Sequence, residues 1–426
     1  PLGPLRDHAD QIVELAPAAV IVDGQDHAAR ARDLAKACPG PLHFTLGGGG
    51  TADLVALAQG QLCPPVDHSD PDQPATVNFT GGTTGRPKSV VRTAGALGQI
   101  SRTILSDFEL PARPIYLAVA PISHVGGTKI VPVLMRGGTV HLMRGFDAGA
   151  VLDTITQARI NMTLMVPTMI YALLDHPHID TSDLSSLDLL LYGAAPMAPA
   201  RLAQGIAKIG PVFAQLYGQT ECYPLAVLPR GDHDPSRPDL LSACGYPVST
   251  VALRLLTPEG TEAPQGTPGE ICVRAPMVMA EYRNRPEETA KALAQGWLHT
   301  GDIAVADATG RLTIVDRSKD MIVTGGFNVY PKEIEDILTA DPAVAMAAVI
   351  GVPDDKWGEA VVAYIVPRAG HTPDTDALCN RVRAEKGPVH RPKAVHLVAE
   401  LPLTALGKVD KVALRAPHWA GRDRQV

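Results

Sequence analysis

The sequence predicts an α/β protein with a large N-terminal domain of layered, mainly parallel sheets, a small β-rich subdomain and a small α+β C-terminal domain. Short continuous apolar runs alternate with helix-length stretches up to about residue 250. Such alternation is typical of a parallel sheet covered on both faces. Short strands and turns follow over residues 251–318, and compact α+β alternation returns over residues 319–426. We therefore expect a large domain at 1–318, with the β-rich part at 251–318, and a small domain at 319–426.

The first elements follow from the apolar pattern. Residues 5–15 have helical periodicity, and residues 18–22 read Ala-Ala-Val-Ile-Val, a run typical of a buried strand. Residues 45–72 hold four successive glycines and several prolines, so we expect a connector there. Beyond them we predict buried strands over residues 114–120, 138–143, 162–166 and 187–192, with helices over residues 148–158 and 168–174.

Turn residues and alternation predict the later elements. Strands are expected over residues 251–256, 269–274 and 311–315, the last after the turn Asp307-Ala308-Thr309-Gly310. Pro331 suits the first turn of a helix, because its missing N–H has no intrahelical partner there. For the final domain we predict helices over residues 331–339 and 375–385, with strands over residues 344–350, 360–366 and 395–398.

Composition excludes several classes of protein. The formal net charge of −7 and the lack of any basic tract argue against a nucleic-acid binder. No apolar run approaches about 18 residues, so a transmembrane helix is not expected. The six cysteines form no CxxC pair, which favours reduced thiols in a cytoplasmic protein. The chain opens at Pro1 without methionine or a secretory apolar segment, so we expect the interior of a longer protein without a targeting peptide.

Residues 79–89 narrowly miss a Walker phosphate loop. They read Phe-Thr-Gly-Gly-Thr-Thr-Gly-Arg-Pro-Lys-Ser. Gly82, Lys88 and Ser89 have the Walker spacing, but Pro87 replaces the last glycine, which removes one N–H and fixes φ. The remaining glycines, threonines and lysine still predict a loop that holds a triphosphate. A glycine-rich surface turn is the alternative for this segment.

Further motifs follow in order, and together they identify a family. They are Tyr-Gly-Gln-Thr-Glu at 217–221, Thr-Gly-Asp at 300–302, Asp-Arg-Ser-Lys-Asp at 316–320, Gly-Gly-Phe-Asn-Val-Tyr-Pro at 325–331 and Gly-Lys at 407–408. From about residue 75 onward the chain resembles the adenylate-forming superfamily, and within it the acyl- and aryl-CoA synthetase branch. Full-length members of that family usually carry further residues before a position such as Pro1.

The resemblance implies a two-step reaction with ATP, Mg²⁺ and coenzyme A. A carboxylate first attacks the α-phosphate of ATP and expels pyrophosphate, and the acyl group then passes from AMP to a thiol. Thr220 would contact the α-phosphate, and Glu221 would help to hold Mg²⁺. Asp302 would accept hydrogen bonds from the ribose, with Arg317 as a second contact. The remaining implied ATP and AMP contacts are Thr80, Gly82, Thr83, Thr84, Lys88, Gly193, Ala194, Ala195, Tyr217, Gly218 and Gln219.

The resemblance also implies a mobile C-terminal domain. Lys408 would bridge the substrate carboxylate and the α-phosphate during adenylation. Lys319 would be the hinge about which the small domain rotates. The rotation would replace Lys408 at the site by the loop of Gly325, Gly326 and Phe327, along which a pantetheine arm could pass.

A hydrophobic acid is the expected substrate. His124 matches a family position whose ring closes the acyl pocket, although a lone histidine in an apolar stretch is more often a core residue. The resemblance implies an acyl pocket formed by Val125, Gly126, Lys129, Val166 and Leu216. Because most of these residues are small or apolar, a fatty, aryl or polycyclic acid fits better than an amino acid. Lys129 could face solvent or a polar group of the acid.

Two departures from the family pattern and two alternatives accompany this hypothesis. Gly81 replaces a usual serine and Ser89 a common glycine, and the first change removes one hydroxyl donor from the loop. An adenylate-forming ligase that loads a carrier protein is the first alternative. A noncatalytic acyl-ligand binder is the second. The sequence leaves open the identity of the acid, the acceptor thiol and whether the protein is a homodimer.

Overall fold

The computed structural model describes residues 5–48, 52–61, 70–80, 88–195, 197–317, 320–325, 327–404 and 408–420. The chain separates into two compact units, Pro1–Ser69 and Asp70–Val426. The first unit contains α1 (Leu5–Leu15), β1 (Ala19–Asp23), α2 (Ala28–Ala37), β2 (Leu42–Leu46) and α3 (Leu54–Ala58). Strands β1 and β2 pair in parallel.

Two expectations for the first unit are wrong. The strand β1 is not buried: Ile21 is 52% exposed, because β1 belongs to a sheet of only two strands. The stretch expected to be a connector includes the end of β2 and the whole of α3. Asp53 caps α3, since its side chain accepts a hydrogen bond from the N–H of Val55.

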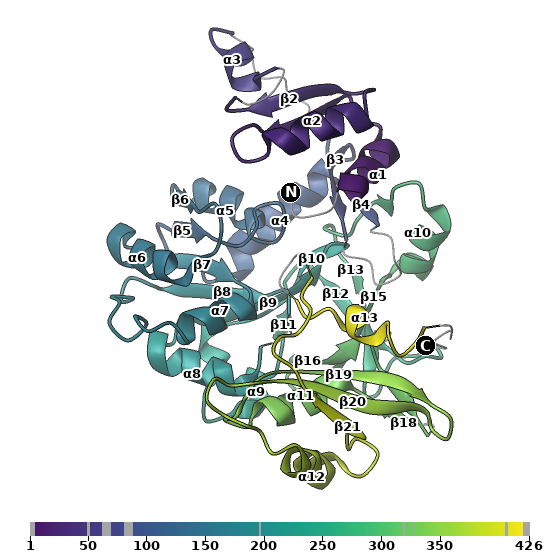
Figure 1. Ribbon diagram of the computed structural model, residues 1–426. Coiled ribbons are helices and arrows are strands. Elements are labelled where there is room, and N and C mark those ends of the chain that lie inside the picture. Colours follow the sequence, from purple (N-terminus) through teal and green to yellow (C-terminus); the bar gives the residue numbers. More distant parts are fainter. Residues whose placement is uncertain are drawn as a thin grey trace. The chain divides into compact units, whose positions relative to one another are not determined.

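A seven-stranded sheet is the centre of the second unit (Figure 1). Its order is β11-β10-β9-β8-β7-β5-β6. Neighbouring strands from β6 to β9 run parallel, and β10 and β11 are antiparallel additions at the other edge. The strands are β5 (Ile115–Ala118), β6 (Thr139–Leu142), β7 (Met162–Met165), β8 (Leu189–Gly193), β9 (Phe213–Gln219), β10 (Cys222–Leu228) and β11 (Tyr246–Pro247). The expectation of a mainly parallel sheet is confirmed.

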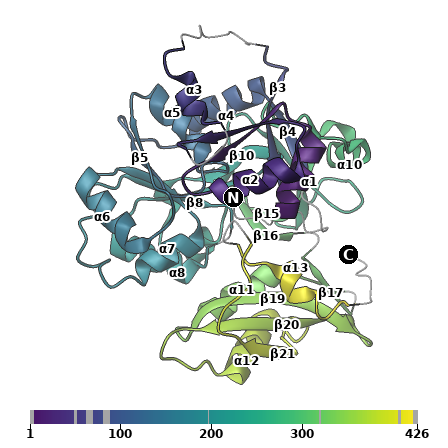
Figure 2. The same cartoon turned by 45° about the horizontal axis from the view of Figure 1, so that its top comes forward.

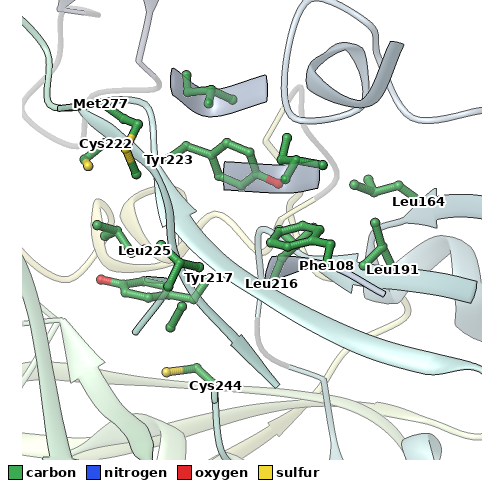
Figure 3. Close-up of a cluster of buried hydrophobic side chains, with 14 of the residues drawn as sticks. Phe108, Leu164, Leu191, Leu216, Tyr217, Cys222, Tyr223, Leu225, Cys244 and Met277 are labelled. Carbon is green, nitrogen blue, oxygen red and sulfur yellow. The ribbon is translucent and has the colours of Figure 1, made fainter. Parts of the chain in front are cut away.

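Helices cover both faces of this sheet. Consecutive residues of a strand point to opposite sides, so each buried strand presents apolar side chains to both faces. On β8, Leu189 and Leu191 join one hydrophobic cluster and Leu190 and Tyr192 another. Figure 3 shows the first cluster, in which side chains from β7 to β10 gather with Phe108. The covering helices are α4 (Ala94–Asp107), α5 (Ile130–Met135), α6 (Ala148–Ala158), α7 (Pro167–Leu174) and α8 (Pro199–Ile209). Within the described ranges no helix is long and apolar enough to cross a membrane.

Strand β6 differs from its prediction. We expected a buried strand, but β6 is the edge of the seven-stranded sheet and Leu142 is 64% exposed. A short apolar run has the same appearance in a central strand and in an edge strand, so the sequence alone does not separate the two.

Two antiparallel sheets also belong to the second unit. One has the order β14-β4-β3, from β3 (Pro74–Phe79), β4 (Ser89–Thr93) and β14 (Glu281–Tyr282). The other has the order β12-β13-β15-β16, from β12 (Ala252–Leu256), β13 (Gly269–Arg274), β15 (Leu298–Ala306) and β16 (Leu312–Arg317). Helices α9 (Pro238–Leu241) and α10 (Pro286–Ala292) lie between these strands in the chain.

The last part of the chain has its own sheet and core (Figure 2). The sheet order is β18-β17-β20-β19, and β21 pairs with β20. The third hydrophobic cluster of the chain includes Ile322, Ile334, Val361 and Val382, and all of its residues lie from Ile322 onward. The elements are β17 (Ile322–Thr324), β18 (Phe327–Val329), α11 (Pro331–Thr339), β19 (Val344–Asp354), β20 (Gly358–Pro367), α12 (Thr375–Lys386), β21 (Ala394–Leu397) and α13 (Lys411–Arg415).

Candidate functional site

The candidate site begins where the parallel strands end. In an open α/β sheet, ligands bind at the carboxyl edge of the strands. Strand β8 ends at Gly193 and is followed by Ala194 and Ala195, and β9 ends at Gln219, directly before Thr220. The fold therefore brings the predicted adenine-contacting and α-phosphate-contacting segments to the same edge of adjacent strands.

Gly193 is required by a close backbone approach. A Cβ atom added at this position would lie 2.3 Å from the carbonyl oxygen of Leu216 on β9, so no other residue fits without moving the strand. The next residue, Ala194, has a φ of +65°, which is uncommon for a residue with a side chain. The chain therefore turns sharply at the end of β8 and presents backbone groups at the sheet edge.

A buried hydrogen bond joins the seven-stranded sheet to the four-stranded sheet. The Tyr217 hydroxyl on β9 donates to Asp302 Oδ2 on β15 over 2.7 Å, and Asp302 is only 4% exposed. Burial, together with the negative charge of Asp302, raises the pKa of Tyr217 well above its usual range, so Tyr217 stays a donor. Gln219 Nε2 also donates to the carbonyl oxygen of Thr300 over 3.4 Å. Arg317 lies opposite Asp302 in the backbone pairing of β15 and β16.

The turn that carries Asp302 is a bulge in β15. The pairing of β13 with β15 shifts register between Glu270 and Cys272, which leaves extra residues on β15. Gly301 takes a φ of +71° there, a value that glycine adopts without strain. Glu270 Oε1 accepts the Gly301 N–H over 2.9 Å, and the Thr300 hydroxyl donates to the Ile271 carbonyl over 2.7 Å. These bonds fix the direction of the Asp302 carboxylate.

Thr80 and Lys88 form the base of the predicted phosphate loop. The Thr80 N–H donates to the Lys88 carbonyl over 2.9 Å. Lys88 Nζ lies 2.5 Å from Glu288 Oε2 on α10 and 4.7 Å from the centre of the Tyr282 ring. Gly82, Thr83 and Thr84 lie outside the described residues. The structure thus places Lys88 at the end of the loop and identifies a carboxylate partner that sequence analysis did not find.

Glu221 is held at the start of β10. Its Oε1 accepts a hydrogen bond of 2.8 Å from the Tyr282 hydroxyl, and its carbonyl oxygen accepts from the Met279 N–H. Burial, reinforced by the Glu221 charge, raises the pKa of Tyr282. Within the described ranges only Oε1 accepts a side-chain hydrogen bond, which leaves Oε2 available for a cation.

Arg92 is a site residue that sequence analysis missed. It lies on β4, shortly after the phosphate loop, and is 9% exposed. Its Nε and Nη2 both donate to the Thr220 carbonyl oxygen, over 3.1 and 2.5 Å. Arg92 therefore links the strand behind the phosphate loop to the turn of Thr220 and Glu221. A charged residue directly after the apolar pair Val90-Val91 was the available signal, because a buried arginine needs a specific partner.

His124 lies within electrostatic reach of the C-terminal lysine. Burial, together with the positive charge of Lys408, lowers the pKa of His124. The Ser123 hydroxyl lies 2.8 Å from His124 Nδ1. The charge of Lys408 therefore acts on His124, although the two predicted catalytic residues are far apart in the sequence.

Lys129, one of the predicted acyl-pocket residues, is fully buried. Lys129 is 0% exposed, and its Nζ donates to the hydroxyls of Tyr223 and Thr128. Nζ also lies 5.4 Å from the centre of the Phe108 ring. Burial lowers the pKa of Lys129 well below its usual range. The first alternative for Lys129, a solvent-facing side chain, is therefore wrong.

The other predicted pocket residues lie near the ends of parallel strands. Gly126 accepts a hydrogen bond from the Tyr116 hydroxyl over 2.9 Å, and an added Cβ would meet the Ala120 carbonyl at 2.7 Å. Val166 caps α7 and Leu216 lies in β9, both buried. Val125 is partly buried and packs against the same hydrophobic cluster as Leu216.

The predicted hinge and pantetheine loop are described only in part. Lys319 and Gly326 lie outside the described residues. Gly325 has a φ of +59° and contacts Trp357 closely, since an added Cβ would lie 2.6 Å from its ring. Phe327 is exposed on β18. Gly325 directly follows β17 and Phe327 begins β18, and their predicted role stays a prediction.

The chain matches two family models and several known proteins. The family model of AMP-binding enzymes matches residues 3–283, and the model of the AMP-binding enzyme C-terminal domain matches residues 333–408. The chain is 45% identical to a medium/long-chain fatty-acid–CoA ligase of Mycobacterium tuberculosis, over 88% of this chain and 67% of that protein. It is 39% identical to a feruloyl-CoA synthase of Amycolatopsis, over 85% of this chain and 76% of that protein.

A solved structure matches nearly the whole chain. It is an amide bond synthetase from Marinactinospora thermotolerans, with a TM-score of 0.89 and 34% identity. The match covers 97% of this chain and 82% of that structure.

We predict that Arg92→Met lowers the free energy of unfolding by about 1–3 kcal/mol, because the Thr220 carbonyl loses both N–H groups that Arg92 donates to it. Denaturant unfolding followed by tryptophan fluorescence measures the change. Arg102→Met on the exposed side of α4 is the matched control and should change stability by less than about 0.5 kcal/mol. Equal effects of the two substitutions would contradict a specific role for Arg92.

Proposed function

The chain belongs to the family of AMP-binding enzymes, and from this membership we propose an ATP-dependent acyl-CoA synthetase that adenylates a hydrophobic carboxylic acid. The proposal rests on the buried hydrogen bond between Tyr217 and Asp302. This bond supports the proposal because it links the Asp302 carboxylate, which would accept hydrogen bonds from a ribose, to the strand that leads into Thr220 and Glu221. Acyl transfer from AMP to coenzyme A completes the reaction.

Adenylation brings a carboxylate to a polyanion, so the site must supply positive charge and N–H donors. Thr220 would contact the α-phosphate, while Thr80, Lys88 and the loop between them would hold the outer phosphates. Mg²⁺ would bind at Glu221 and neutralise charge on the phosphate oxygens. The fit is supported by Glu221 Oε1, which Tyr282 fixes, and by Oε2, which accepts no hydrogen bond from a described residue.

Lys408 would neutralise the charge that develops between the acid and the α-phosphate. The effect of its charge on the pKa of His124 supports this placement, because His124 adjoins the predicted acyl pocket. We further propose that the domains divide at residue 319 and that Lys319 is the hinge. The separate hydrophobic core from Ile322 onward supports that division. Rotation about the hinge would then bring Gly325, Gly326 and Phe327 to the thiol.

The acid that we propose is largely apolar with one polar group. Leu216, Val166 and Val125 offer apolar contacts, which suit a fatty, aryl or polycyclic acid. The names of the similar CoA ligases, with fatty and feruloyl acids, support that range. Lys129 is the one basic group among the proposed pocket residues, and its amine would favour an acid with a hydrogen-bond acceptor away from the carboxylate.

We predict ATP–pyrophosphate exchange that depends on a hydrophobic acid, followed by formation of a CoA thioester. Exchange is measured with labelled pyrophosphate over a panel of fatty, aryl and polycyclic acids, and thioester by mass spectrometry. Amino acids are the negative control. Exchange without any CoA thioester would assign the acyl group to another acceptor, such as a carrier protein. Binding of the acid without any exchange would support a noncatalytic binder.

We predict that Lys408→Ala lowers the rate of adenylation by at least about 100-fold, the scale of a lost electrostatic contact to a developing charge. Thioester formation from preformed acyl-adenylate should be spared, because Lys408 would leave the site for that step. The two half-reactions are measured separately in single-turnover assays. Lys411→Ala, on α13, is the nearby control. Equal loss of both half-reactions would contradict a rotating C-terminal domain.

A further inference from the structure

Three side chains with metal-binding atoms meet on one face of the four-stranded sheet. Cys272 on β13 lies directly opposite His299 on β15, and Glu270 lies two residues before Cys272 on the same strand. Alternate residues of a strand share a face, so Glu270 and Cys272 point the same way. Cys272 Sγ lies 3.3 Å from His299 Nδ1, His299 Nδ1 2.8 Å from Glu270 Oε2, and Cys272 Sγ 3.9 Å from Glu270 Oε2.

We propose that Glu270, Cys272 and His299 form a binding site for a zinc ion. One ligand atom from each residue lies within 4.8 Å of the other two. Tetrahedral zinc with the usual Zn–S, Zn–N and Zn–O lengths separates its ligand atoms by about 3.4–3.6 Å. The three observed separations differ from this range by about 0.6 Å or less, which small side-chain rotations can supply.

The donor set selects zinc over the magnesium that the nucleotide requires. A thiolate and an imidazole suit zinc, whereas magnesium prefers oxygen ligands. The carboxylate and the thiolate carry two negative charges, which balance the charge of Zn²⁺. Binding releases the thiol proton of Cys272, and the imidazole proton of His299 resides on Nε2 once Nδ1 holds the metal.

Solvent can reach the cluster from one side. The side chains of His299 and Glu270 are 30% and 27% exposed, whereas Cys272 is fully buried. A zinc ion can therefore enter between His299 and Glu270, with a water molecule as its fourth ligand. Three protein ligands and one water are a coordination that zinc commonly adopts in proteins.

The cluster adjoins the bulge that carries Asp302. His299 immediately precedes Thr300, and Glu270 Oε1 already holds the Gly301 N–H while Oε2 faces His299. A zinc ion on Oε2, Nδ1 and Sγ would link β13 to β15 at the base of this bulge. The site thus lies in the same sheet as the proposed ribose contact but on different side chains, separate from the proposed magnesium position at Glu221.

The test uses the full chain, stripped of metal with a chelator and titrated with CoCl₂, because Co²⁺ is a spectroscopic substitute for zinc. We expect a thiolate-to-cobalt charge-transfer band that saturates at one equivalent and disappears on addition of ZnSO₄. Cys272→Ser should abolish the band. Cys379→Ser, which removes another buried thiol, should retain it. Zinc should also raise the melting temperature of the unsubstituted chain and of Cys379→Ser, but not of Cys272→Ser.

A measurement without any substitution keeps the proposal testable if Cys272→Ser does not fold. X-ray absorption at the zinc edge should show one sulfur ligand at about 2.3 Å and nitrogen or oxygen ligands at about 2.0–2.2 Å. The absence of a charge-transfer band, or a band that survives in Cys272→Ser, would overturn the proposal. A coordination shell without sulfur would overturn it as well.

Discussion

The hydrogen bond between Tyr217 and Asp302 is the contact on which the candidate site depends. It joins the last parallel strand of the seven-stranded sheet to the four-stranded sheet, and both side chains are almost completely buried. A buried carboxylate needs a partner, and Tyr217 supplies it. The bond also sets the position of Asp302 relative to the turn of Thr220 and Glu221, since Tyr217 lies three residues before Thr220. Together with the bond from Gln219 to the Thr300 carbonyl, it holds the two sheets that carry the proposed ribose and phosphate contacts in a fixed relation.

Three further contacts hold Asp302, Glu221 and Thr220 near this hydrogen bond. Glu270 fixes the bulge that carries Asp302, Tyr282 fixes Glu221, and Arg92 fixes the carbonyl of Thr220. Each of them connects residues that are far apart in the sequence. Such preorganised polar groups cost little reorganisation when charge develops during a reaction. The fold thus supports the proposed chemistry mainly through residues that need not touch the substrate.

The periodic and capped elements could be predicted from the sequence. Helices α6 and α11 have the predicted bounds, and the alternation of strands and helices correctly predicted the mainly parallel sheet. The exposure of β1 and β6 could not be predicted, because an apolar run does not reveal how many strands flank it. Motif resemblance identified Asp302, Glu221 and Lys408. It did not identify Arg92, Tyr282, Glu270 or Glu288, whose roles arise from contacts between distant strands and helices.

The proposed function requires that the acid attacks the α-phosphate of ATP. Its most direct test is a single turnover with an acid labelled with oxygen-18 in its carboxyl group, followed by mass spectrometry of the nucleotide product. We expect AMP to carry one labelled oxygen, because the thiol displaces AMP together with the carboxyl oxygen that attacked phosphorus. Unlabelled AMP, with the departing labelled oxygen found in inorganic phosphate, would contradict it.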